Sequence, residues 1–229
     1  MKNPFENFIV PNFWKKFTIM FIAILLMGFF LSFLIEVGWG TDPATFMNYN
    51  LASTFNLSFG NWQMICNTLM FIVMLVFNRK LFGFGTICNW VLIGYTADFF
   101  NWLWERIGFH ALIASGENFM LNLTVFVVAI ACFIIVAAVY MNADMGLSPY
   151  DGIPKIISQH LPKIPYAVVR IVYDMLVILI GYVTCRFNPK GMQGSVIGSI
   201  VMAVCLGPVI SFVGSFMQKH IAIFAKQEQ

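Results

Sequence analysis

Six long apolar segments occupy most of this chain, and their length constrains the fold more than any other feature. A helix of about 20 apolar residues crosses roughly 30 Å of hydrocarbon. Only 10% of the 229 residues are charged, so lipid must cover much of the folded surface. We therefore expect one all-α, polytopic domain over residues 1–229, surrounded by the lipid bilayer. The predicted spans are 17–37, 60–78, 83–103, 118–141, 166–186 and 193–216.

The order of motifs repeats between about 17–103 and about 118–216. In each part a glycine-rich turn with a proline, at 38–44 and at 144–151, follows the first span and opens a short connector helix. Each part also has a small pair, Gly85-Thr86 or Gly194-Ser195, that opens its third span. Three spans is an odd number, so the second part enters the membrane from the opposite side. The sequence thus predicts two inverted three-helix repeats, a recurrent architecture of secondary transporters.

Lysine and arginine predict the orientation, since basic short loops stay in the cytoplasm. With the N-terminus inside, Arg106, Arg186 and Lys190 are the basic residues of the outer side. We expect a multi-pass protein of the cell membrane with both termini in the cytoplasm. The cytoplasmic basic residues would be Lys2, Lys15, Lys16, Arg79, Lys80, Lys155, Lys163, Lys219 and Lys226.

Several functional classes lack their motifs in this sequence. The three histidines have no metal-ligand spacing, and no G-x-S-x-G, Walker or H-E-x-x-H pattern occurs. The five cysteines are scattered singly through apolar segments. The net charge of +3 is accounted for by the cytoplasmic loops and carries no nucleic-acid signal. We expect no enzyme, no metal, no cofactor and no nucleic-acid partner.

Ionisable residues inside a membrane segment cost roughly 3 kcal/mol each and mark functional candidates. Arg170 and Asp174 lie four residues apart on one face of the fifth span, where they can pair. Asp151, in the preceding connector, can complete a three-member network. Arg170 either forms a neutralised ion pair that holds the connector helix against the span, or binds a substrate carboxylate or phosphate through two N-H groups of its guanidinium. The sequence leaves both interpretations open.

The two proline turns have the chemistry of helix starts. Asp42 precedes Pro43 as an N-cap, and Ser148 to Asp151 has the spacing of a capping box. Uncapped N-H groups at such a terminus bind anions, whereas Asp42 and Asp151 can satisfy those donors themselves. Asp98, in the third span, is either a proton-coupling carboxylate or a residue of the outer interface. Two further candidates on this span, Thr86 and Asn89, are favoured as packing and hydrogen-bonding positions.

Four stretches together resemble the YczE-like bacterial integral membrane proteins and, more distantly, the YitT type. They are Leu-Ser-Phe-Gly-Asn-Trp (57–62), the run from Gly85 to Asp98, Gly-Leu-Ser-Pro-Tyr-Asp-Gly (146–152) and Val-Arg-Ile-Val-Tyr-Asp (169–174). The resemblance implies a multi-span bacterial membrane protein in which positions 151, 170 and 174 form a pattern. The chain departs from that pattern where Ala44 and Thr45 replace an aromatic residue and Asp.

These features favour a small secondary transporter or exporter of an anionic or zwitterionic metabolite. Two alternatives remain: a substrate-capturing membrane subunit of a larger transporter, and a membrane partner that regulates another protein without transport. Inversion symmetry argues against simple capture, and the cost of intramembrane charge argues against a regulator. Six spans are few for a transporter, so a homodimer is a further expectation.

Overall fold

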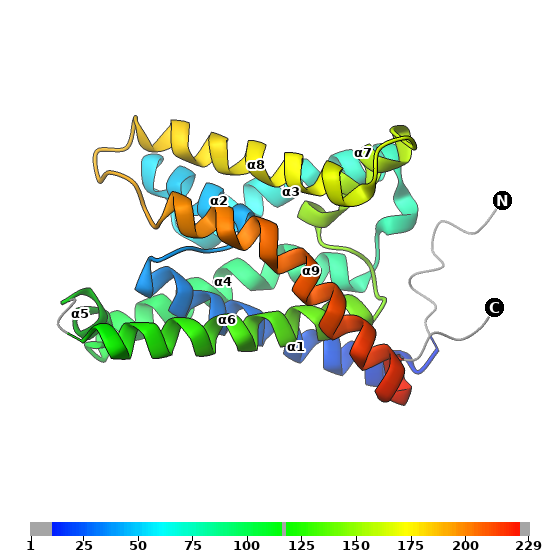
Figure 1. The fold of residues 1–229 in the computed structure, drawn as a ribbon, viewed down its shortest axis with the longest axis horizontal. Helices are drawn as coiled ribbons and strands as arrows, with labels where there is room; N and C mark the ends of the chain where they lie inside the picture. The colour runs from blue at the N-terminus through cyan, green and yellow to red at the C-terminus, as the bar shows by residue number, and fades with distance from the viewer. Residues whose placement is uncertain (1–10, 116–117, 225–229) are drawn as a thin grey trace.

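The computed structural model describes residues 11–115 and 118–224, which form helices joined by short connections and, within these ranges, no strand. The long helices run roughly side by side along the longest axis of the molecule (Figure 1). They are α1 (Phe13–Val37), α3 (Phe59–Phe77), α4 (Phe84–Arg106), α6 (Phe119–Asn142), α8 (Tyr166–Cys185) and α9 (Val196–His220). The shorter ones are α2 (Pro43–Thr54), α5 (Phe109–Ala114) and α7 (Pro149–His160), with 3-10 turns at Arg79–Leu81 and Ala222–Phe224.

The helices form two groups (Figure 1). In one group α1 packs against α4 and α6, and in the other α2 packs against α8 while α7 packs against α3. The two groups are joined where α3 meets α4 and where α9, which crosses the view diagonally, meets both α6 and α8. Each of the short helices α2 and α7 packs against both α3 and α8.

Five described helices are long and apolar enough to cross a membrane: α1, α3, α6, α8 and α9. The segment predicted at 83–103 forms α4, whose 23 residues span about 35 Å at 1.5 Å per residue. Its length suffices, but Thr86, Asn89 and Asp98 lower its hydropathy. A count of six spans therefore stays a prediction. The short α5 was not predicted, and α9 continues to His220 beyond the predicted end at 216.

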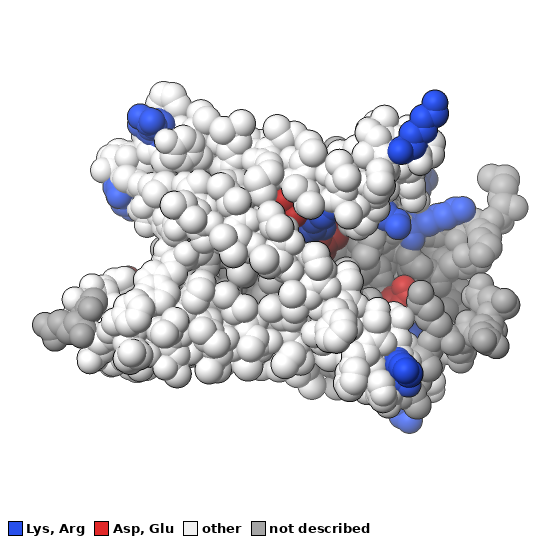
Figure 2. All heavy atoms as spheres, viewed as in Figure 1, with Lys and Arg blue, Asp and Glu red and all other residues white. Residues whose placement is uncertain are grey.

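The surface agrees with a lipid environment. Large apolar side chains such as Leu69, Val76, Leu176 and Phe212 are exposed on the outer faces of the long helices. In Figure 2 the basic side chains gather at the two ends of the molecule, and the surface between the ends is almost free of charge except in a central hollow. Such a distribution matches hydrocarbon around the middle and headgroups at both ends.

Two close backbone crossings position the short helices. The turn before α2 has Gly40 at a φ of 148°, and a Cβ on Gly198 of α9 would lie 2.8 Å from the Cα of Gly40. The turn before α7 has Gly146 at a φ of 105°, and a Cβ there would lie 2.6 Å from the backbone nitrogen of Gly83. Only glycine permits such approaches at both partners. Each turn is thereby held against the start of a long helix.

Candidate functional site

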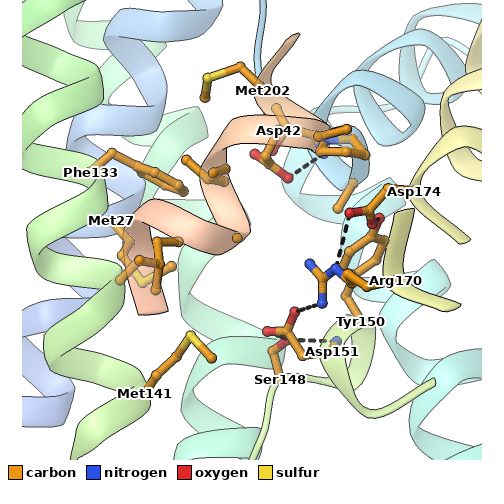
Figure 3. A pocket seen from close by; sticks show the side chains of 18 of the residues that line it. Met27, Asp42, Phe133, Met141, Ser148, Tyr150, Asp151, Arg170, Asp174 and Met202 are labelled. Carbon is orange, nitrogen blue, oxygen red and sulfur yellow. Dashed lines mark hydrogen bonds and ion pairs between the residues drawn. The ribbon is translucent and has the colours of Figure 1, made fainter. Parts of the chain in front are cut away.

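A cavity of about 330 Å³ lies inside the bundle, and residues from both halves of the chain line it. Its volume falls at the lower end of the range of small-molecule sites. The first residues of α2 and α7 both face it, with Asp42 at one helix start and Ser148 at the other. Apolar walls come from Met27, Phe133 and Met202 (Figure 3). The cavity therefore combines two helix N-termini with a mostly apolar lining.

The starts of both short helices are capped by their own side chains. Asp42 accepts a hydrogen bond from the backbone N-H of Thr45 at 3.1 Å. Ser148 accepts one from the N-H of Asp151 at 3.0 Å and donates its hydroxyl to the Asp151 carboxylate at 2.6 Å. Both helices begin with proline, whose fixed φ suits the first helical position. Capping thus uses part of the donor capacity that a bound anion would need.

Arg170 of α8 is held by two carboxylates at the cavity wall (Figure 3). Its Nη1 donates to Asp151 at 2.5 Å, and its Nε donates to Asp174 at 3.0 Å. Tyr150 donates its hydroxyl to the other oxygen of Asp174 at 2.5 Å, and the guanidinium carbon lies 5.1 Å from the centre of the Tyr150 ring. We call Tyr150, Asp151, Arg170 and Asp174 the charge network. It joins α7 to α8, as the sequence predicted for three of its members.

Burial raises the pKa of two groups of this site that lie outside the spans. It raises the pKa of Tyr150 well above its usual value, so the phenol remains a donor to Asp174. It also raises the pKa of Asp42, against the opposing effect of the Thr45 hydrogen bond. The charged form of each group is disfavoured because little solvent reaches it.

The remaining predicted candidates divide between the cavity and the packing. Asn89 lines the cavity. Thr86 is buried at the start of α4, where it accepts a hydrogen bond from the N-H of Gly83 at 3.1 Å. Asp98 lies outside the cavity lining and accepts from the N-H of Gly60 at 2.8 Å. It therefore caps the start of α3 from the neighbouring helix, a role that the sequence interpretation did not include.

Tyr150, Gln63 and Asn67 are among the cavity residues that the sequence analysis did not single out. A signal for the last two was available in the repeat. Gln63 and Asn67 follow Pro43 by 20 and 24 residues, and Arg170 and Asp174 follow Pro149 by 21 and 25. Within one residue of the same distance from the proline, one half thus carries an amide pair and the other an ion pair. Among the described residues, no group of three His, Cys, Asp or Glu could hold a metal ion.

Comparison with known proteins agrees with this architecture. Residues 14–215 match a family described as a family of unknown function, DUF6198. The chain is 26% identical over 199 residues to the uncharacterized membrane protein YczE of Bacillus subtilis (strain 168), covering 86% of this chain and 84% of that protein. No solved structure matches. The resemblance to YczE-like proteins is thus confirmed, and this chain, a membrane protein with several apolar helices, belongs to the DUF6198 family.

Proposed function

We propose that this protein is a small secondary transporter of the cell membrane and that its cavity is the substrate site. The observation that carries the proposal is the cavity itself, which the N-termini of α2 and α7 and the charge network line together. Transporters of several folds place their substrate between two repeats, at the starts of interrupted or short helices. Intramembrane charges that face a cavity are typical of such pathways.

The packing supports a description of the molecule as two inverted repeats, α1–α4 and α6–α9. In these repeats α1 corresponds to α6, α2 to α7, α3 to α8 and α4 to α9. When corresponding helices are exchanged, the contact of α2 with α8 becomes the contact of α7 with α3. The contact of α1 with α4 becomes that of α6 with α9 in the same way. The two glycine crossings are also exchanged. In this exchange Gly198, which crosses Gly40, takes the place of Gly83, which crosses Gly146.

The charge balance favours a cationic or zwitterionic substrate over a purely anionic one. Three carboxyl groups line the cavity, those of Asp42, Asp151 and Asp174, and the last two alone outnumber the one guanidinium of Arg170. Arg170 already donates to two of these carboxylates, so few of its guanidinium N-H groups are free to bind a substrate anion. A substrate ammonium group could bind beside Asp42 and the charge network and offset the excess of negative charge.

Flux through proteoliposomes tests the transporter proposal. Liposomes containing the purified protein would be exposed to an isotopically labelled bacterial metabolite extract, and the labelled compounds that enter would be identified by mass spectrometry. We expect amine-containing metabolites to enter faster than into protein-free liposomes. The double substitution of Arg170→Gln with Asp174→Asn should reduce this entry to background. If no compound enters but some bind to the purified protein, substrate capture for a separate complex would replace transport.

A further inference from the structure

Three uncharged amides form a second polar group in the cavity, apart from the charge network. Gln63 and Asn67 come from α3 and Asn89 comes from α4, and all three line the cavity. We call them the amide cluster. Trp90 of α4 donates its indole N-H to the Thr68 hydroxyl of α3 at 3.1 Å. This register of the two helices brings the neighbouring residues Asn89 and Asn67 into one region.

The amide cluster is buried yet has no protein partner. Gln63, Asn67 and Asn89 are 7%, 4% and 6% exposed. None of the three makes a side-chain hydrogen bond within the part of the chain that the structure describes, and the Gln63 carbonyl oxygen is buried without a donor. An unsatisfied buried amide costs about 1–3 kcal/mol. The Gln63 oxygen is such a group, and together with the amides of Asn67 and Asn89, which line the same cavity without a protein partner, it points to an occupant that supplies the missing partners.

The chemistry of the cluster suits an uncharged partner. A side-chain amide offers donors and an acceptor together, which match another amide or a hydroxyl group. Among the described residues that line the cavity, the acidic and basic ones are Asp42, Asp151, Arg170 and Asp174. A ligand that spans both regions would therefore be positive at one end and polar but uncharged at the other.

We propose that the amide cluster is a recognition site and that the substrate is a small amine carrying an uncharged amide or hydroxyl group. This inference rests on the proposed function, because it takes the same cavity as the substrate site. The ammonium group binds at Asp42 and the charge network, while the uncharged group exchanges hydrogen bonds with the amide cluster. A site built to hydrogen-bond such a group discriminates strongly against analogues that lack it.

Binding of matched probes to the purified full chain in detergent tests the inference by isothermal titration. The probes are 6-aminohexanamide and its shorter homologues, with 6-aminohexanoate, hexanamide and 1,6-diaminohexane as analogues. We expect an amino amide to bind at least about tenfold more tightly than the amino acid and than the amide without an amine. Equal binding of all analogues, or no binding by any amino amide of the series, would overturn the inference.

A change of specificity separates recognition from folding. Asn67→Asp and Asn89→Asp add a carboxylate where the uncharged end binds, so each should shift preference from the amino amide to the diamine by about tenfold or more. Asn61→Asp is the matched control on α3, because Asn61 is exposed and accepts from Tyr95 at 2.9 Å outside the cavity lining. Unchanged preference in folded Asn67→Asp and Asn89→Asp would show that the amides hold only water.

The flux assay distinguishes failure of this inference from failure of the transporter proposal. If a probe binds in a way that depends on the amide cluster but does not enter the proteoliposomes, the inference would stand and transport would be refuted. Uptake of metabolites that Asn67→Leu and Asn89→Leu leave unchanged would keep the transporter and refute the recognition site.

Discussion

Arg170 illustrates how one residue can connect two helices and shape a cavity at once. Its guanidinium donates to Asp151 on α7 and Asp174 on α8, and Asp174 also receives the Tyr150 hydroxyl. Removal of the arginine would leave both carboxylates with a hydroxyl donor but without their cationic partner. The structural and functional interpretations of Arg170 are compatible, because the same network that joins the helices also lines the cavity.

Removing the guanidinium should destabilise the protein. We expect Arg170→Ala to lower the free energy of unfolding by about 3 kcal/mol, the low end for a broken buried pair, because the side chains of Arg170 and Asp151 remain 26% and 22% exposed. Arg170→Lys should lower the free energy of unfolding by less, since lysine keeps the positive charge although it lacks the guanidinium geometry that reaches both carboxylates. Thermal denaturation in detergent measures both. A wild-type melting temperature in Arg170→Ala would contradict a structural role for the network.

Asp42 should make stability depend on pH. Burial raises its pKa in the folded state, so its contribution is greatest below the unfolded-state pKa and is lost as pH rises through the folded-state pKa. Asp42→Asn keeps an N-cap and removes the charge. We expect this variant to melt at a higher temperature than the wild type at pH 8, and this difference in melting temperature should mostly disappear at low pH. A gain independent of pH would show that the charge of Asp42 is not the cause.

The candidate site could be predicted from the sequence only where a residue is costly in lipid. Arg170, Asp174 and Asp151 stand out because charge within or beside an apolar segment needs a partner. The amides Gln63 and Asn67 attract less notice, since such groups also serve helix packing. Their exposure to the cavity depends on the register of α3 against α4, which no local pattern specifies. The contact of Asp98 with the N-H of Gly60 could not be predicted for the same reason, because Gly60 lies on the neighbouring helix.

At the scale of elements, hydropathy located the helices well and their contacts poorly. The helices α1, α3, α6 and α8 lie close to their predicted ranges because a long apolar run in lipid has no other regular structure available. The capping residues Asp42 and Ser148 marked the starts of α2 and α7 correctly. The pairing of α2 with α8 and of α7 with α3 could not be predicted, because it joins one half of the chain to the other.

The crossing of α9 with the turn before α2 should depend on a missing side chain. A Cβ on Gly198 would press against the Trp39 carbonyl oxygen and Gly40. We therefore expect Gly198→Ala to lower the free energy of unfolding by about 1–3 kcal/mol. Gly207 in the same helix has nothing within 4 Å of a built Cβ. Gly207→Ala should be nearly neutral, because the gain in helix propensity is offset by crowding against Pro208. Equal melting temperatures of the two variants would contradict the close crossing.

At the scale of the whole molecule, the distribution of charge fixes an expected orientation. Seven basic residues of the described chain belong to the turns and helix ends where α1 begins, α3 meets α4, α7 meets α8 and α9 ends. Three belong to the opposite side, after α4 and between α8 and α9. The basic side should face the cytoplasm. The seven are Lys15, Lys16, Arg79, Lys80, Lys155, Lys163 and Lys219.

Labelling of single cysteines in whole cells tests this orientation and the sixth span together. In a background without the native cysteines, we expect a membrane-impermeant maleimide to label Arg106→Cys and Lys190→Cys but not Arg79→Cys or Lys163→Cys. Opening the cells should make the last two reactive, which controls for folding and access. If α4 did not cross the membrane, positions 79 and 106 would react from the same side, and the second half would no longer be inverted. The cavity would then lose the two-repeat geometry that alternating access uses.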